Sequence, residues 1–289
     1  NPQPFTLEAG VFLIADALDM EKGRARIPLT DEIKRKLSLY CNVPEEAIVS
    51  SMYTEVVYEL PLILEKQGLG NYICRYFKIP EEKPKIDEWI NMVRQYKESK
   101  EIVNIALPGK YCDIMDSYVS INEALMHAAA HLGAKVKIRW IDSEIFEKHQ
   151  DKLSILNTFD GVLLTPGFGL RGVEGMISSA RYAILNEIPF LGICFGAQLM
   201  FVAFCREKLG YEDAASTEVN PSTTHPVVDL MPEQKNVELM GGTMRLGGMK
   251  VYLKKGTKIY EAYKRDVIVE RFRHRYLSLI HISEPTRPL

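Results

Sequence analysis

Cys194 stands in a sequence context that suits covalent catalysis. Residues 189–198 read PFLGICFGAQ, a short apolar run followed by Gly-x-Cys-x-Gly and the start of a helical pattern. Glycines at 192 and 196 allow the sharp strand-to-helix turn that exposes a nucleophile at the edge of a sheet. The N-terminus of the following helix would favour a thiolate, which can attack a carbonyl carbon. The alternative is a buried cysteine at a glycine-flanked strand end.

A second glycine-rich turn could complete such a site. Residues 165–172 read TPGFGLRG and directly follow the apolar run at 161–164. Exposed backbone N–H groups in a turn of this kind can hold an oxyanion. The N–H of Gly167 and the N–H of Phe195 would together supply the two donors that a tetrahedral intermediate requires. Taken alone, a turn of this sequence is more often only a turn.

Four apolar runs separated by helical patterns would position both turns. They read IVNIAL, VKIRWI, GVLLT and PFLGI, beginning at residues 102, 136, 161 and 189, and each has the length of a buried strand. This alternation predicts an α/β fold, with a doubly wound, mostly parallel sheet flanked by helices. Cys194 would then lie at the carboxyl end of the sheet.

The chain before residue 101 has a different pattern. TDE at residues 30–32 predicts a capped helix start. ELPL at 59–62 is expected to break any helix, and QGLG at 67–70 is expected to end the segment. Residues 78–100 are polar, contain two prolines and hold a short amphipathic helix around Trp89. We interpret them as an interdomain linker.

Composition restricts the functional class. The 36 basic and 38 acidic residues nearly cancel, which argues against a polybasic surface for nucleic acid or lipid. Five widely spaced cysteines, without CxxC pairs or histidine spacing, predict no metal site and a reducing compartment. No run approaches the roughly 20 apolar residues of a membrane span, and the start lacks the layout of a signal peptide. We expect a cytoplasmic protein with no nucleic-acid or membrane partner.

Several longer motifs, in order, resemble the CTP synthase family. They include IPLTDEIKRKLSLYCNVPEEAI, LGICFGAQ, STEVNP, GGTMRLG and RFRHRY. The resemblance covers about residues 23–276. It implies a class I glutamine amidotransferase domain at 101–276, preceded by the carboxyl-terminal remnant of a synthetase (amidoligase) domain at 23–77. Residues 1–22 match no family motif and are expected to be foreign or divergent.

The resemblance also implies roles for individual residues. Cys194 would be the nucleophile, and the glutamine pocket would be lined by Gly167, Phe195, Gly196, Ala197, Gln198, Glu218 and Arg275. These types suit an amino-acid ligand, because a carboxylate can pair with the α-ammonium group and a guanidinium with the α-carboxylate. Lys36 matches a family lysine that contacts the pyrimidine nucleotide, although a plain helix-surface lysine is nearly as good an interpretation.

For the intact protein the resemblance implies a ligase. In this family, glutamine is hydrolysed through a cysteine thioester, and the ammonia aminates UTP to CTP with ATP and magnesium. Family members form homotetramers and respond to GTP and CTP. The ATP and magnesium sites would lie upstream of residue 23, so no cofactor or metal is expected in this segment. A peptidase-like cysteine hydrolase is a weaker alternative, since it would have no use for STEVNP, GGTMRLG and RFRHRY.

Departures from the family pattern predict that this chain, as written, is inactive. The catalytic His-x-Glu pair has no match among the six histidines, which are His127, His131, His149, His225, His274 and His281. Residues 277–289 resemble a sequencing-adapter scar, so we expect a truncated domain with a sheet that is incomplete at the carboxyl end. Pro166 and Val119 replace a family glycine and lysine. The alternative function is a non-catalytic regulatory or assembly module with the same fold.

Overall fold

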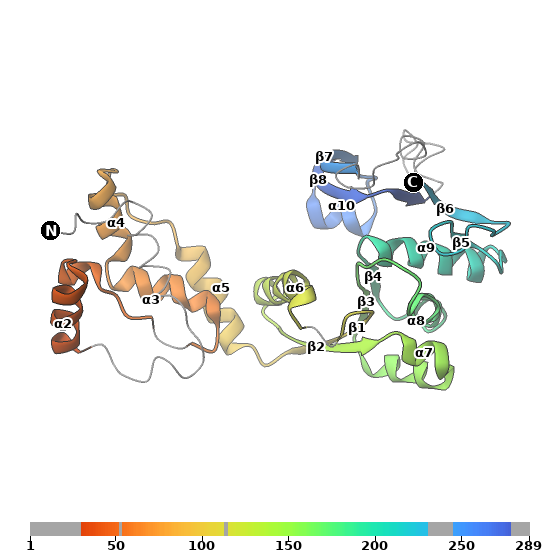
Figure 1. Cartoon of the computed structure of the whole chain (residues 1–289), viewed down its shortest axis with the longest axis horizontal. Helices are drawn as coiled ribbons and strands as arrows, with labels where there is room; N and C mark the ends of the chain where they lie inside the picture. The colour runs from red at the N-terminus through yellow and green to blue at the C-terminus, as the bar shows by residue number, and fades with distance from the viewer. Residues whose placement is uncertain (1–29, 52–53, 113–114, 231–244, 279–289) are drawn as a thin grey trace. The chain divides into compact units, whose positions relative to one another are not determined.

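The computed structural model describes residues 30–51, 54–112, 115–230 and 245–278. These residues form two compact units (Figure 1). The first contains the described residues up to Glu101 together with His127–Lys135, and the second contains Ile102–Met126 and the described residues from Val136 onward. The segment 1–22 and residues 279–289, for which the sequence predicts a foreign origin, lie outside the described residues.

The first unit is helical. Its elements are α2 (Asp31–Cys41), η1 (Glu45–Ala47), η2 (Val57–Glu59), α3 (Leu60–Lys66), α4 (Leu69–Phe77) and α5 (Asp87–Glu98). Thr30 caps α2 as predicted, because its hydroxyl oxygen accepts a hydrogen bond from the N–H of Ile33 at 3.3 Å. The amphipathic helix expected around Trp89 is also confirmed, since α5 buries Met92 and Val93.

Two predictions for this unit were wrong. Residues 59–62 do not break a helix but begin one, α3, with Pro61 in its first turn. A proline is tolerated there because the first N–H groups of a helix have no intrahelical partner. Residues 67–70 do not end the segment either. Gly68, with a φ of 80°, makes the turn from α3 into α4.

The second unit is built on a four-stranded sheet in the order β2-β1-β3-β4. The strands are β1 (Ile102–Gly109), β2 (Lys135–Asp142), β3 (Gly161–Leu164) and β4 (Phe190–Gly192). β3 pairs in parallel with both β1 and β4. All four predicted strands are present, and the α/β class with a mostly parallel sheet is confirmed.

Helices cover both faces of this sheet (Figure 1). They are η3 (Met115–Tyr118), α6 (Val119–Leu132), α7 (Glu144–Lys148), η4 (Gln150–Thr158), α8 (Val173–Leu185) and α9 (Phe195–Lys208). Neighbouring strand residues point to opposite faces. Leu163 therefore packs with Ile121 of α6, whereas Val162 and Leu164 belong to the larger core with Met176 of α8. Burial on both faces explains why the strands read as continuous apolar runs.

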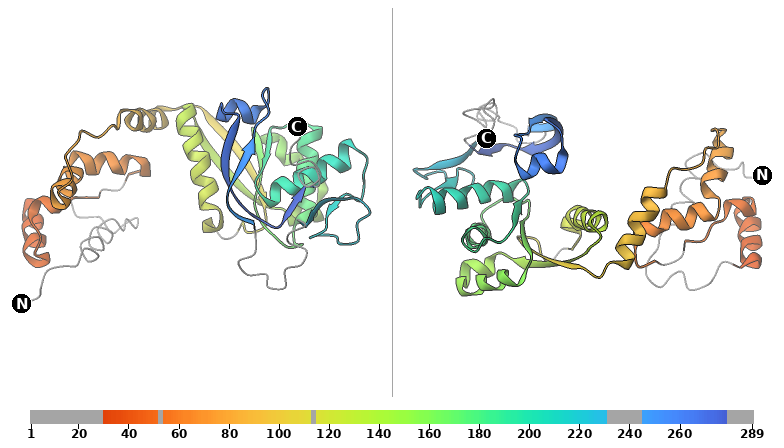
Figure 2. Two further views of the ribbon diagram at one scale, coloured as in Figure 1. Left: turned by 90° about the horizontal axis from the view of Figure 1, so that it is seen from above. Right: turned by 180° about the vertical axis from the view of Figure 1, so that it is seen from behind.

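The remaining strands form two smaller sheets that the sequence analysis did not predict. β5 (Ala215–Ser216), β6 (Pro226–Leu230) and β9 (Tyr276–Ser278) form one. In the other, β7 (Arg245–Tyr252) pairs antiparallel with β8 (Val267–His274), and α10 (Lys258–Tyr263) connects the two strands along the chain (Figure 2). In β9, Leu277 pairs with Asp229 and Ser278 with Val228, so the first two residues of segment 277–289 continue this strand. Within the described ranges, no helix has the length and apolar character needed to cross a membrane.

Candidate active site

Cys194 occupies a strained turn between β4 and α9. Its backbone has a φ of 53° and a ψ of −111°, and it is the N-cap residue of α9. A non-glycine residue in such a conformation costs about 1–3 kcal/mol, and strain of this kind concentrates at functional sites. A Cβ at position 196 would lie 2.3 Å from the Leu164 carbonyl oxygen, and one at 192 would lie 2.6 Å from the Ala197 nitrogen. Both glycines are therefore required for the turn, as predicted.

The electrostatic environment of Cys194 differs from the prediction. Burial raises the pKa of its thiol above the ordinary value, and the negative charge of Glu218 raises it further. The N–H of Phe195 hydrogen-bonds the sulfur and opposes this shift. The expected preference for the thiolate was wrong, because the loss of hydration outweighs the donor at the helix N-terminus.

The loop that follows β3 lies beside the nucleophile. A Cβ at Gly167 would be 3.8 Å from the ring of Phe195, so the loop packs against the first residue of α9. Pro166, which has no N–H to donate, accepts a hydrogen bond at its carbonyl from the Tyr118 hydroxyl at 3.4 Å. The structure thus brings Gly167 and Phe195 together, as the two motifs predicted.

Lys110 also belongs to this site, and the sequence analysis did not single it out. It follows β1 directly and is only 3% exposed. Its ammonium group donates to the carbonyls of Phe168, at 3.0 Å, and Gly169, and lies 4.5 Å from the centroid of the Phe195 ring. The available signal was its place at the carboxyl end of a predicted strand, where sites of open parallel sheets form.

Glu218 comes into the same site from the segment after β5. Burial raises the pKa of its carboxyl group, whereas the N–H of Gly169, which hydrogen-bonds the carboxylate, and the positive charge of Lys110 lower it. Because its charge also acts on Cys194, Glu218 lies within electrostatic reach of the nucleophile. The charge of the predicted acid of the pocket therefore acts on the predicted nucleophile.

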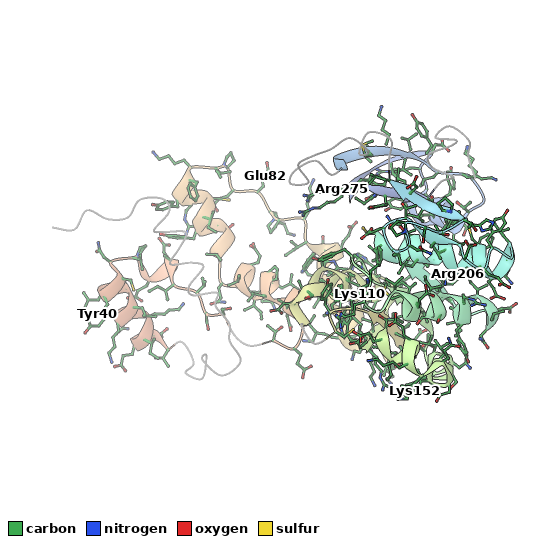
Figure 3. The ribbon with its side chains drawn as sticks, turned by 45° about the vertical axis from the view of Figure 1, so that its right-hand side comes forward. Tyr40, Glu82, Lys110, Lys152, Arg206 and Arg275 are labelled. Atoms are coloured by element: carbon green, nitrogen blue, oxygen red, sulfur yellow. The ribbon has the colours of Figure 1, made fainter. Side chains whose placement is uncertain are left out.

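Gln198 contacts the backbone of β9, directly after Arg275 in the chain. The side-chain amide of Gln198, on α9, donates to the carbonyl of Tyr276 at 2.9 Å, and Nδ1 of His274 lies 2.8 Å from the same oxygen. Burial raises the pKa of Tyr276, the charge of Glu218 raises it further, and the charge of Arg275 opposes the shift. Both predicted ligand-binding charges therefore influence Tyr276, and Figure 3 labels Arg275.

Among the other residues considered in the sequence analysis, Ala197 contributes its backbone to the turn at Cys194, whereas Lys36 and His225 make contacts of their own with neighbouring residues. Ala197 is in the first turn of α9, and its backbone nitrogen lies so close to Gly192 that a Cβ at position 192 would collide with it. Lys36 is in the first unit, exposed on α2, with its ammonium nitrogen 2.7 Å from a Glu32 carboxylate oxygen. His225 hydrogen-bonds Asp213 and stacks on Tyr211 in the segment before β6. In the part of the chain that the structure describes, no cluster of three or more His, Cys, Asp or Glu side chains is arranged to hold a metal.

Comparison with protein families defines the class first. Residues 113–285 match the family "Glutamine amidotransferase class-I". This range contains β2, β3 and β4 of the sheet, the cysteine turn and the Glu218 segment. The solved glutaminase domain of Trypanosoma brucei CTPS with bound acivicin has 35% sequence identity and a TM-score of 0.56, covering 61% of this chain and 68% of that one. The second unit is therefore a class I glutamine amidotransferase domain.

The particular family follows from the rest of the chain. Residues 16–79 match the family "CTP synthase N-terminus". The CTP synthase of Pyrococcus abyssi is 51% identical to this chain, over 88% of this chain and 47% of its own length. The CTP synthase of Methanopyrus kandleri is 47% identical, over 88% of this chain and 48% of its own length. The chain belongs to the CTP synthase family, whose members are ligases. It spans about half the length of the curated relatives it matches.

Proposed function

We propose that Cys194 attacks the side-chain amide carbon of glutamine. A carbon–sulfur bond forms, and the tetrahedral oxyanion is held by the N–H groups of Gly167 and Phe195. The proton released from the Cys194 thiol passes to the amide nitrogen, and the carbon–nitrogen bond breaks to release ammonia. Water then hydrolyses the thioester to glutamate and restores the thiol. The observation that carries the proposal is the left-handed backbone of Cys194 at the start of α9, a strained geometry that the surrounding packing maintains.

The binding roles follow from the charges around Cys194. Glu218 pairs with the α-ammonium group of glutamine, because its carboxylate is half-buried and lies near the nucleophile. Arg275 pairs with the α-carboxylate. Gln198 fixes the backbone next to Arg275 through its hydrogen bond to the Tyr276 carbonyl. Gly196 and Ala197, in the first turn of α9, complete the wall of the pocket.

For the intact protein we propose the reaction that the relatives' name states, the synthesis of CTP. The ammonia would aminate UTP after activation by ATP with magnesium, and GTP and CTP would act as regulators of a homotetramer. Lys36 would contact the pyrimidine nucleotide from the segment at 23–77, which the linker at 78–100 joins to the amidotransferase domain at 101–276. No described residue of this chain is assigned to ATP or magnesium.

The second candidate function is a glutamine-binding module without hydrolysis. Two observations favour it for this chain. The raised pKa of Cys194 keeps the sulfur protonated at neutral pH unless a base removes the proton. Pro166 supplies no N–H to the oxyanion loop. Such a module would bind glutamine and serve regulation or assembly.

Protection from alkylation tests both candidates. The chain is treated with iodoacetamide, with L-glutamine, D-glutamine or neither, and labelling of Cys194 and Cys112 is quantified by peptide mass spectrometry. L-glutamine alone should slow labelling of Cys194, while Cys112, which is half-buried, serves as the internal control. Equal labelling of Cys194 in all samples would refute glutamine binding.

Ammonia release then separates the two candidates. Hydrolysis predicts release that is lost in Cys194→Ala. Protection without release would favour the non-catalytic module.

A further inference from the structure

Lys110 carries a buried positive charge that glutamine hydrolysis, as proposed above, does not use. A lysine that is 3% exposed is unusual, because removing an ammonium group from water is costly unless partners replace the lost hydrogen bonds. Here the partners are two backbone carbonyls, those of Phe168 and Gly169, and the face of the Phe195 ring. Lys110, which Figure 3 labels, therefore holds the loop after β3 from its place at the end of β1.

The hydrogen bond to Phe168 fixes the direction of a peptide group. In a trans peptide the C=O and the N–H point in opposite directions. Because the Phe168 carbonyl is turned toward the Lys110 ammonium, the N–H of the same peptide, which belongs to Gly169, points away from it. That N–H hydrogen-bonds the carboxylate of Glu218. Lys110 thus orients the loop after β3, and through the Gly169 N–H of that loop it also orients the Glu218 carboxylate.

Further contacts connect Lys110 to its surroundings. The Arg171 guanidinium donates to the backbone carbonyl of Lys110. It also donates to a carboxylate oxygen of Glu144, at 2.8 Å. Burial lowers the pKa of the Lys110 ammonium to about 8, with Glu218 and Glu147 opposing the shift and Arg171 adding to it. The charge that holds the loop can therefore be removed near neutral pH.

We propose that Lys110 is a positioning residue of the glutaminase site. Its ammonium group holds the loop after β3 so that Glu218 meets the α-ammonium group of the substrate and the N–H of Gly167 meets the oxyanion. This inference rests on the proposed hydrolysis of glutamine at Cys194. It predicts that loss of Lys110 slows the reaction of Cys194 with electrophiles that must first bind as an amino acid. The reaction of the Cys194 sulfur with a simple electrophile should be unaffected.

Two electrophiles separate these effects in the full chain. Acivicin, which is bound in the Trypanosoma brucei glutaminase structure, resembles an amino acid and is the ligand-like probe. The thiolate of Cys194 displaces its chloride, forming a carbon–sulfur bond. Iodoacetamide is the sulfur-only probe and loses iodide in the same way. Dividing the two rate constants removes the dependence on thiolate concentration.

The variant Lys110→Met removes the charge and keeps much of the side-chain volume. We expect it to lower the acivicin rate constant by about tenfold or more, as for a lost charged hydrogen bond, and to change the iodoacetamide rate constant by less than about threefold. Lys152→Met, an exposed lysine of the same unit, is the matched control and should change neither. An unchanged ratio in Lys110→Met would overturn the inference.

A pH profile provides a test that does not depend on the Met variant folding. In the wild-type chain the ratio should fall as the pH rises through about 8, where the Lys110 ammonium is lost. In Lys110→Arg, whose guanidinium stays protonated, that fall should be absent, and only the titration of acivicin itself remains. Identical profiles in the two proteins would overturn the inference.

The outcomes also separate this inference from the proposed function. If L-glutamine fails to slow the reaction of wild-type Cys194 with acivicin, both are refuted. If glutamine protects the wild-type cysteine and the ratio is the same in Lys110→Met, the glutaminase site stands and the role of Lys110 does not.

Discussion

The turn at Cys194 depends on close contact between α9 and β3, and Gly196→Ala tests that contact. A Cβ at this position would lie 2.3 Å from the Leu164 carbonyl oxygen, whereas real Cβ atoms essentially never come within 3.0 Å of such a neighbour. The obstacle is backbone, so it cannot rotate away. Overpacking of this kind costs about 1–3 kcal/mol, and the better helix propensity of alanine returns at most about 1 kcal/mol. We expect the free energy of unfolding to fall by about 1–2 kcal/mol.

Urea denaturation followed by tryptophan fluorescence measures the change. The chain has two tryptophans, and Trp140 stacks on Tyr118 in the second unit. Placing every variant in a Trp89→Phe background makes Trp140 the sole reporter. Gly167→Ala is the matched control, because its Cβ would have its nearest neighbour at 3.5 Å, an ordinary contact. It should change the free energy of unfolding by less than about 0.5 kcal/mol.

The comparison can refute the reasoning. If Gly196→Ala is as stable as Gly167→Ala, α9 can move away from β3 without cost, and the turn is not held by this contact. A changed slope of the denaturation curve would indicate instead that the denatured or native state had altered its compactness.

Two further predictions concern charge. Glu218→Gln removes a negative charge that raises the pKa of Cys194, so the pH midpoint of its iodoacetamide labelling should move to lower pH; a midpoint that stays in place or rises would contradict this assignment. Arg206→Met breaks an ion pair with Glu174 and a hydrogen bond to a backbone carbonyl from a side chain that is 15% exposed. It should cost about 1–2 kcal/mol of unfolding free energy by urea denaturation. Arg181→Met loses an ion pair with Glu207 from an arginine side chain that is 47% exposed. It should cost less than about 1 kcal/mol, and equal losses in the two variants would show that burial of the arginine is not the deciding factor.

Much of the fold was determined by local sequence. The four strands of the parallel sheet were predicted because each is an apolar run of strand length bounded by turns or helical patterns. The cap at Thr30 and the two glycines around Cys194 were also readable, because they depend on residues within a few positions of one another. The small sheet that contains β5, β6 and β9 was missed, since strands of two to five residues carry too little pattern to distinguish them from loops.

The site was predicted by residue type and decided in detail by tertiary contacts. Sequence motifs placed Cys194, Glu218 and Gln198 at the site, but the hydrogen bond from Gln198 joins it to Tyr276, 78 positions away. The pKa of Cys194 is raised and the pKa of Lys110 is lowered because residues distant in the sequence bury both groups and place charges near them. The sequence by itself thus determined which residues could do chemistry. Only the tertiary structure decided their protonation and orientation, because hydration and charge act through space and not along the chain.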